Sequence, residues 1–219
     1  MVAKRLYDLF FSAFGLLALG PLFILLAAMV KFCDGGPVFF LQRRIGLQGR
    51  PFYICKFRTM VVNAGRFGLN LTRSGDARVT VIGRWLRQTK LDELPQLWNV
   101  FKGEMSLVGP RPEVPEYVER YTPGQRAVLE LMPGITDLAS LEFRKEEELL
   151  KSAVDMEGFY LTHCVPRKIE LNLLYARNAN LWRDSKIILR TLFPKRTGRS
   201  RASFGKVIQT SPSLPTTPV

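Results

Sequence analysis

Histidine and cysteine are both scarce in this chain. His163 is the only histidine among 219 residues, which excludes a multi-histidine metal site and disfavours a Ser-His-Asp triad. Cys33, Cys55 and Cys164 are far apart and match no metal-binding spacing. Because they are odd in number and scattered, they argue against a disulfide framework and fit a reducing compartment. The chemistry is therefore expected from other residue types.

Acidic residues are outnumbered by basic ones. The chain has 19 Asp and Glu against 32 Lys and Arg, a net charge of +13. A balance this basic implies a polyanionic neighbour: nucleic acid, an anionic membrane or phosphorylated substrates. Nucleic acid is disfavoured, because the sequence has no helix-turn-helix, zinc-finger or RNP motif. Hydrophobic residues make up 47% of the chain, so a packed core is expected.

Charge is absent altogether from Leu9 to Val30. At about 1.5 Å per residue, this segment is long enough to cross a hydrocarbon core of about 30 Å. It is too long for a cleaved signal peptide and lacks the cleavage pattern. The simplest interpretation is an N-terminal transmembrane anchor.

Gly20 and Pro21 interrupt this apolar segment near its middle. Proline removes a backbone donor and clashes with the preceding turn, so a kink or break is expected there. The flanks are basic on both sides, with Lys4 and Arg5 before the segment and Lys31 after it. The positive-inside rule places both flanks in the cytoplasm, which a re-entrant hairpin satisfies and a straight span does not. A proline-kinked spanning helix stays the alternative.

The rest of the chain predicts a mostly helical α+β fold with short strands. Turn residues bound two short strands, and polar, glycine-bearing residues 63–78 predict a loop. Three parts are expected: a membrane helix-break-helix over 1–34, a catalytic domain over 35–194 and a basic, then Ser/Thr/Pro-rich disordered tail over 195–219. The predicted strands are Val38–Gln42 and Phe52–Phe57, and the predicted helices are Val79–Gln88, Thr89–Lys102, Pro115–Leu131, Phe143–Met156 and Arg167–Leu192.

The helix predicted over Thr89–Lys102 carries an adjacent acidic pair near its start. Thr89 and Asp92 have the spacing of a capping box, and Gly103 suits the C-terminal stop. Pro95 is tolerable only near the first turn, so the start is expected nearer Asp92. The apolar face of this helix is expected to consist of Leu94, Leu97, Trp98 and Phe101.

Asp92 and Glu93 alone are weak evidence of catalysis, because adjacent acidic residues usually lie on a solvated surface or cap a helix. At a helix start, however, they could flank one phosphate from different sides. Lys56 and Arg58 lie at the end of a predicted strand and share a face by alternation. They form either a solvated edge or a phosphate clamp. Arg111 lies between two prolines that fix its backbone, which suits bidentate phosphate binding.

In these segments the chain resembles the bacterial sugar transferases that are small monotopic phosphoglycosyl transferases. The similarity runs from Lys4 to about Leu192, and its most specific part is the block from Leu91 to Pro112. The matching segments are KRLYDLFFSAFGLLALGPLFILLAAMVK, GGPVFFLQRRIG, FYICKFRTM, LRQTKLDELPQLWNVFKGEMSLVGPRP and PGIT.

The resemblance implies transfer of a phosphosugar from a UDP-sugar to a polyprenol phosphate, usually undecaprenyl phosphate, with release of UMP. This is a first membrane step of glycoconjugate biosynthesis, and the implied location is the bacterial inner membrane with the catalytic domain facing the cytoplasm. Asp92 is implied as the nucleophile of a ping-pong reaction through a covalent aspartyl-phosphosugar intermediate. Glu93, with Asp92, is implied to hold Mg²⁺. Cations near the site correspond to Lys56, Arg58, Arg87 and Arg111.

Two positions depart from the family pattern. The helix break is Gly20-Pro21, without the serine hydroxyl common there, and the common PGITG continues here with Asp137. The role of Asp137, the sugar, the downstream glycan and the formation of a homodimer stay open. A non-catalytic membrane scaffold, which would use its basic surface to bind anionic lipid or a partner, is the competing hypothesis.

Overall fold

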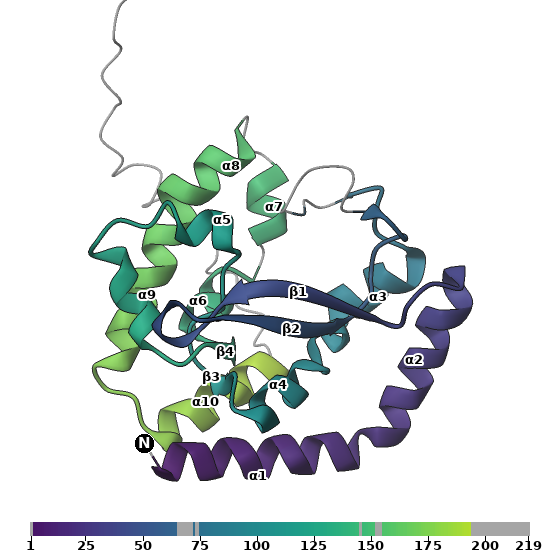
Figure 1. The fold of residues 1–219 in the computed structure, drawn as a ribbon, viewed down its shortest axis with the longest axis horizontal. Helices are drawn as coiled ribbons and strands as arrows, with labels where there is room; N and C mark the ends of the chain where they lie inside the picture. Colours follow the sequence, from purple (N-terminus) through teal and green to yellow (C-terminus); the bar gives the residue numbers. More distant parts are fainter. Residues whose placement is uncertain (1, 65–71, 73–74, 145, 152–154, 194–219) are drawn as a thin grey trace, which may run out of the picture.

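The computed structural model describes residues 2–64, 72, 75–144, 146–151 and 155–193. The predicted tail over 195–219 and most of the predicted loop over 63–78 lie outside these residues. Within them the chain is mostly helical, with four short strands in two separate two-stranded sheets (Figure 1). The predicted fold class is confirmed in this respect.

The apolar N-terminal segment forms two helices with a bend between them. Helix α1 spans Val2–Ala18 and α2 spans Gly20–Asp34, so the break adjoins Gly20 and Pro21 as predicted. Pro21 lies in the first turn of α2, where its missing N–H costs nothing. No single described helix is long and apolar enough to cross a membrane; α1 and α2 pass that test only together, at a bend of 63°.

The first sheet is an antiparallel hairpin that carries Lys56. Strand β1 spans Phe39–Ile45 and β2 spans Pro51–Phe57, with Phe40 opposite Lys56. Both predicted strands are confirmed, and the turn between them lies where Gly46–Pro51 predicted it. A core cluster of Leu26, Val30, Phe57 and Leu86 packs this hairpin against α2 and α3 (Val81–Thr89).

The second sheet is parallel and frames the loop that carries Arg111. Strand β3 spans Ser106–Val108 and β4 spans Gly134–Thr136. The single helix predicted over Pro115–Leu131 between them is wrong: α5 covers only Pro115–Val118, and a 3₁₀ turn, η4, covers Gln125–Glu130. Thr122 and Gln125 cap this turn reciprocally through their side chains, so a new element starts there.

The C-terminal helices are shorter than predicted. Each predicted long helix, Phe143–Met156 and Arg167–Leu192, corresponds to more than one element. Asn180 accepts a hydrogen bond from Arg183 N and starts a new helix, which explains one division. The elements are α6 Leu138–Glu142, α7 Glu146–Lys151, α8 Met156–Phe159, a π-helical turn Tyr160–Cys164, α9 Val165–Ala176 and α10 Leu181–Leu192.

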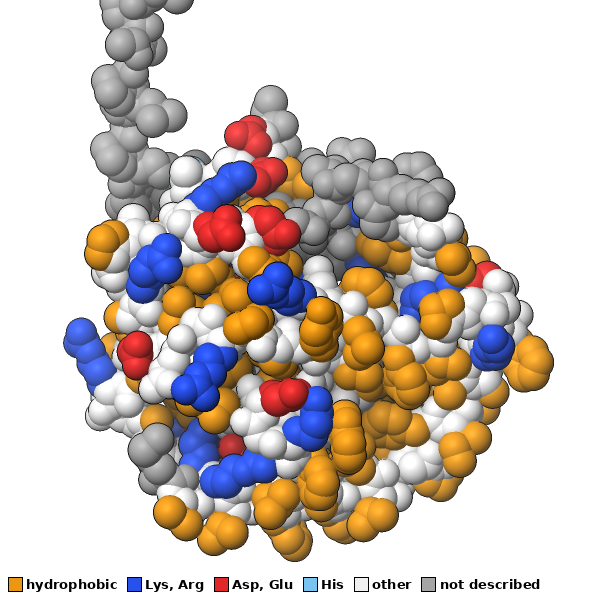
Figure 2. Space-filling model, viewed as in Figure 1, with side chains coloured by type: hydrophobic (Ala, Val, Ile, Leu, Met, Phe, Trp, Pro, Cys, Tyr) orange, Lys and Arg blue, Asp and Glu red, His pale blue; other side chains and the backbone are white. Residues whose placement is uncertain are grey.

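Helix α1 turns its polar side chains toward the protein and its apolar side chains outward. Asp8 and Ser12 are buried, whereas Leu6, Phe10 and Phe14 are more than 60% exposed. Hydrophobic side chains gather along α1, α2 and the hairpin on the face drawn in Figure 2. This arrangement reverses the usual amphipathic pattern of a soluble protein, in which the apolar stripe faces the core.

Candidate active site

The two adjacent acidic residues lie in a 3₁₀ turn, Leu91–Glu93 (η3), between α3 and α4 (Gln96–Lys102). The predicted continuous helix over Thr89–Lys102 is therefore wrong. Thr89 ends α3, where its hydroxyl donates to the carbonyls of Trp85 and Leu86, and does not cap the next helix. Pro95 explains the late start of α4, because a proline inside a helix would leave a carbonyl unpaired.

Helix α4 buries polar side chains and exposes aromatic ones. Gln96 and Asn99 are buried, whereas Trp98 and Phe101, predicted on its apolar face, are 50% and 38% exposed. Asn99 donates to Tyr53 O and accepts from Cys55 N, so it attaches α4 to β2. The polar face of α4 thus positions the turn that carries the acidic pair.

Glu93 lies between two cations from elements distant in sequence. Lys56 Nζ on β2 lies 3.2 Å from Glu93 Oε1. Arg111, which follows β3, donates from Nη1 to Oε2 at 3.0 Å and from Nη2 to Oε1. The Arg111 contact is bidentate, the geometry in which arginine binds carboxylate or phosphate most strongly.

Asp92 is buried beside this ion-paired cluster without a full set of partners. Its side chain is 7% exposed, and its Oδ1 has no hydrogen-bond partner among the described residues. A buried acceptor left unpaired costs about 1–3 kcal/mol, so its retention needs an explanation beyond folding. An unpaired carboxylate oxygen near cations is suited to nucleophilic attack or to metal binding.

The two carboxyl groups have opposite pKa shifts. Burial, and then the charge of Glu93, raises the pKa of Asp92 above its usual value. Burial alone would also raise the pKa of Glu93, but Arg111 and Lys56 outweigh it and hold that pKa well below its usual range. Burial lowers the pKa of Lys56 to about 8, although Glu93 opposes this shift. Such divergent shifts are typical of functional sites.

Two glycines fix the loop that presents Arg111. Gly134 N donates to Pro110 O at 2.9 Å, and a Cβ on Gly134 would lie 2.1 Å from Gly109 N. The backbones of β3 and β4 approach each other this closely only without side chains there. Asp137 also accepts from Arg111 N at 3.3 Å. The PGIT segment and Asp137 therefore hold the backbone of the loop.

Arg58 and Arg87 contact other partners. Arg58 is buried, and its guanidinium donates to both oxygens of Asp34 and to Pro37 O, which attaches the end of α2 to the hairpin. Arg87 Nε donates to Thr59 Oγ1 at 2.9 Å, and its charge lowers the pKa of Asp92. The structure thus brings Lys56 and Arg111 to Glu93, while a phosphate contact of Arg58 stays a prediction.

Sequence reasoning missed three polar residues around the site. Arg44 donates to Pro112 O at 3.0 Å and supports the Arg111 loop from β1. Gln96 is fully buried, and neither atom of its amide has a partner among the described residues. Asn172 on α9 donates to Asp137 Oδ2 at 2.8 Å. The one signal in the sequence for any of these three residues was the position of Gln96, a polar residue that lies four positions after Asp92 inside an apolar block.

The acidic pair fits a magnesium ion chemically. Mg²⁺ prefers oxygen ligands and usually keeps water or substrate phosphate among them. Asp92 Oδ1 is unpaired among the residues that the structure describes. Glu93 accepts three hydrogen bonds from them, which leaves one of about four lone-pair positions open. No group of three or more His, Cys, Asp or Glu side chains that could hold a metal occurs in the described ranges. The remaining ligands would have to come from substrate or water, and Mg²⁺ stays a prediction.

Comparison with known proteins finds extended similarity. The chain is 38% identical over 88% of its length to the UDP-glucose:undecaprenyl-phosphate glucose-1-phosphate transferase of Klebsiella pneumoniae. It is 39% identical over 93% of its length to the undecaprenyl-phosphate glucose phosphotransferase of Komagataeibacter xylinus. The chain spans 40% and 37% of these two proteins.

A relative of similar size matches as well. The exopolysaccharide production protein ExoY of Sinorhizobium fredii is 35% identical over 87% of this chain, which covers 84% of that protein. The family model described as bacterial sugar transferase matches residues 1–196, which include both acidic residues and the Arg111 loop. The chain therefore belongs to the bacterial sugar transferase family.

Proposed function

We propose that this protein transfers a phosphosugar from a UDP-sugar to undecaprenyl phosphate and releases UMP. The observation that carries the proposal is Asp92: a buried carboxylate with an unpaired oxygen, adjacent to an ion-paired Glu93 and two cations. The names of the two undecaprenyl-phosphate relatives describe this type of reaction with glucose. The sugar of this chain is left open.

Asp92 is the nucleophile in this proposal. Its Oδ1 attacks the β-phosphorus of the UDP-sugar, and the bond from that phosphorus to the oxygen bridging the two phosphates breaks. UMP leaves with the electron pair, and an aspartyl-phosphosugar remains. An oxygen of the lipid phosphate then attacks the same phosphorus, which forms the lipid diphosphosugar and restores the Asp92 carboxylate.

Lys56 and Arg111 stabilise the developing negative charge. Without substrate they are paired with Glu93, and a pyrophosphate entering the site offers them oxygens of the same geometry. Glu93 keeps both cations in place between turnovers, so little reorganisation is needed when the donor binds. Mg²⁺, held by Asp92 and Glu93, would add further neutralisation of the pyrophosphate.

The exposed apolar side chains support our proposal that this site lies at a membrane surface. Leu6, Phe10 and Phe14 recur every four residues on one side of α1, and Trp98 and Phe101 stack on each other at 5.6 Å on α4. A helix pair bent by 63° with basic flanks fits a hairpin that enters and returns to the cytoplasmic face of the inner membrane. A soluble donor and a lipid phosphate could both reach Asp92 from that surface.

Release of UMP tests the reaction. The purified protein, given UDP-glucose or other UDP-sugars with undecaprenyl phosphate and Mg²⁺, is expected to release UMP. Asp92→Asn is expected to lower turnover by at least about a thousandfold, because no covalent intermediate can form. Near-normal turnover of Asp92→Asn would exclude the aspartyl mechanism. Membrane binding without UMP release from any UDP-sugar would support a non-catalytic scaffold instead.

Labelling of cysteines from outside intact cells tests the topology. Cys33 is exposed at the end of α2 and reports on that flank in the unmodified chain. Ala3→Cys in a background that carries Cys33→Ser and Cys55→Ser reports on the other flank. A re-entrant hairpin predicts that an impermeant reagent labels neither position before lysis and both after it. Labelling of one flank alone would establish a true span.

A further inference from the structure

Lys90 connects the end of α3 to the turn that carries Asp92 and Glu93. Its backbone is left-handed, with φ of 60° and ψ of 15°. Its N–H donates to the carbonyls of Leu86 and Arg87, which ends α3, and its carbonyl accepts from Glu93 N at 3.3 Å, which begins η3. The conformation of Lys90 thus sets the direction in which the chain enters the turn of the acidic pair.

Glycine is the residue that this conformation favours. A left-handed backbone brings the Cβ of other residues too close to the following carbonyl oxygen, and glycine has no Cβ. Gly35 and Gly103 end α2 and α4 in the same conformation, with φ of 70° and 90°. Among the described helix ends with a left-handed cap, the one beside the acidic pair alone carries a side chain. A side chain that is kept at the cost of backbone strain indicates a function for that side chain.

The ammonium group of Lys90 is available to bind an anion. Lys90 is exposed, and its ammonium makes no hydrogen bond or ion pair with the residues that the structure describes. Lys56 and Arg111, in contrast, are both paired with Glu93. The charge of Lys90 opposes the rise that burial causes in the pKa of Asp92, and it adds to the lowering of the pKa of Glu93 by Arg111 and Lys56. Lys90 therefore lies close to the acidic pair and can bind an anion without first leaving another partner.

We propose that Lys90 is a further catalytic residue, whose ammonium group binds a phosphate oxygen of a substrate beside Asp92. The inference rests on the proposed function, which supplies two phosphate sources: the pyrophosphate of the UDP-sugar and the phosphate of the lipid. Both approach the same carboxylate, one in each half of the reaction. A lysine ammonium is a compact charge on a flexible stem, so it can follow oxygens that move as bonds form and break.

Lys90→Gly separates a role in phosphate binding from a role in ending the helix. Glycine fits the left-handed backbone, so the midpoint of thermal unfolding should stay the same or rise. The variant should lower kcat/KM for UMP release about tenfold, a modest loss because water partly screens an exposed charge. Lys90→Arg keeps the charge and should stay within about threefold of the unmodified protein. A lower midpoint for Lys90→Gly would instead assign the charge of Lys90 to the end of α3 and overturn the inference.

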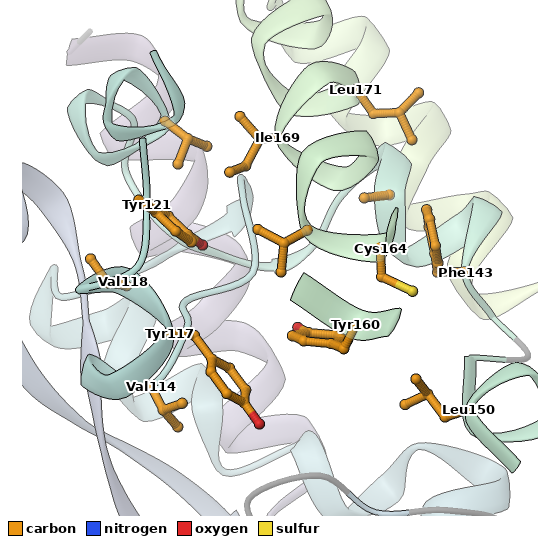
Figure 3. Close-up of a cluster of buried hydrophobic side chains, with 13 residues drawn as sticks. Val114, Tyr117, Val118, Tyr121, Phe143, Leu150, Tyr160, Cys164, Ile169 and Leu171 are labelled. Atoms are coloured by element: carbon orange, nitrogen blue, oxygen red, sulfur yellow. The ribbon is translucent and has the colours of Figure 1, made fainter. Parts of the chain in front are cut away.

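Two control variants show what the same kinds of change do elsewhere. Gln48 is exposed in the turn between β1 and β2, and its backbone is also left-handed, with φ of 55°. Gln48→Gly should leave UMP release unchanged. Leu171 is buried in the core cluster drawn in Figure 3, whose described members include none from α3, η3 or α4. Leu171→Ala should lower the midpoint of thermal unfolding by several degrees and leave UMP release unchanged well below that midpoint.

Steady-state kinetics identify which phosphate Lys90 binds. In a ping-pong reaction, kcat/KM for the UDP-sugar reports the first half-reaction, and kcat/KM for the lipid phosphate reports the second. A loss in Lys90→Gly that is confined to the UDP-sugar assigns Lys90 to the pyrophosphate. A loss confined to the lipid phosphate assigns it to the acceptor, and a loss for both substrates assigns it to both in turn.

Three kinetic results would overturn the inference. The first is an unchanged kcat/KM for both substrates in Lys90→Gly. The second is a loss in Lys90→Arg as large as in Lys90→Gly, because the charge would then not be the cause. The third is an equal loss in Gln48→Gly, which would show that relief of backbone strain, rather than removal of the cation, lowers activity.

Calorimetric titration of the full chain with inorganic phosphate and with pyrophosphate, without lipid or Mg²⁺, tests the inference without turnover. Lys90→Gly should bind at least one of these ions about three- to tenfold more weakly than the unmodified protein does, whereas Gln48→Gly should bind both equally well. If no UDP-sugar is turned over, weaker binding by Lys90→Gly would support the phosphate contact and contradict the proposed reaction alone. Equal binding of both ions by Lys90→Gly and the unmodified protein would overturn the phosphate contact, whatever the turnover.

Discussion

Burial makes the charge of Lys56 easier to lose than that of an ordinary lysine. Burial brings its pKa down to about 8 from its usual 10.5, so the folded protein loses this charge as the pH rises through about 8. If charged Lys56 neutralises the donor phosphates, kcat/KM for UMP release should fall above that pH. Arginine keeps its charge at this pH. In Lys56→Arg, the pH at which kcat/KM begins to fall should therefore rise by at least about one pH unit.

Unfolding does not explain such a loss. Between about 8 and 10.5 the unfolded chain binds more protons at Lys56 than the folded chain does, so this group makes folding more favourable as the pH rises. Thermal unfolding of the two proteins at pH 7 and pH 9 provides the control. If kcat/KM falls at the same alkaline pH in the unmodified protein and in Lys56→Arg, Lys56 is excluded as the titrating group.

The role of Arg111 depends on the shape of its guanidinium group as well as on its charge. Its bidentate contact with Glu93 uses two parallel N–H groups that a lysine lacks. Arg111→Lys should therefore lower kcat/KM about 10- to 100-fold, consistent with about 1.5–3 kcal/mol for a hydrogen bond to a charged group. Arg126→Lys, at a hydrogen-bonded arginine of η4 away from the site, is the matched control. A change of similar size in both variants would contradict a specific role for Arg111.

At the scale of elements, the close approach of β3 and β4 holds the Arg111 loop. Gly134→Ala would place a Cβ 2.1 Å from Gly109 N, so one strand must shift. We expect a loss of about 1–3 kcal/mol in the free energy of unfolding together with a loss of activity, because the loop moves with its strand. Gly124→Ala meets nothing within 4 Å and should change neither quantity. Chemical denaturation and UMP release measure the two effects, and full activity of Gly134→Ala would contradict this role.

The elements also show what the sequence could predict. The hairpin, the break at Gly20-Pro21 and the helix stop at Gly103 were predictable because local backbone chemistry decides them. The division of Pro115–Leu131 was not predicted, although the reciprocal cap between Thr122 and Gln125 is itself a local signal for a new start. Local sequence signals predict the positions of turns well, whereas they predict the lengths of helices poorly.

The candidate site was predictable in part for the same reason. Asp92 and Glu93 were identifiable within a specific block, but the pairing of Glu93 with Lys56 and Arg111 depends on two strands meeting one turn. Arg58 has the same sequence signal as Lys56, yet it contacts Asp34. Tertiary contacts decide between these two cations, and the sequence carries no periodic pattern that could distinguish them.

At the scale of the whole molecule, polar contacts attach α1 to the rest of the protein. Lys4 pairs with buried Asp184 on α10 at 2.5 Å, and Arg5 donates to the carbonyls of Val100 and Phe101 at the end of α4. Asp8 accepts from Leu107 N. Because these contacts occupy the polar face of α1, its apolar face is turned outward and its orientation relative to the active site is fixed.

This orientation leads to a prediction about membrane binding. Phe10 and Phe14 are 64% and 61% exposed on that outer face. Burial of one phenylalanine in lipid contributes about 1.5–3 kcal/mol. The double substitution Phe10→Glu and Phe14→Glu should therefore lower binding to phospholipid vesicles by at least about a hundredfold, measured by flotation. The fold should persist, since neither side chain belongs to the core.

Leu174→Glu provides the matched control. Leu174 is 55% exposed on α9, outside the apolar stripe of α1, so its substitution should leave flotation unchanged. Thermal unfolding in detergent should be similar for all three proteins. Undiminished flotation of the double variant would show that α1 does not bind lipid through this face. Reduced flotation, with an unchanged rate of UMP release from a UDP-sugar when a soluble, short-chain lipid phosphate is the acceptor, would assign membrane binding to α1 and leave the chemistry to Asp92.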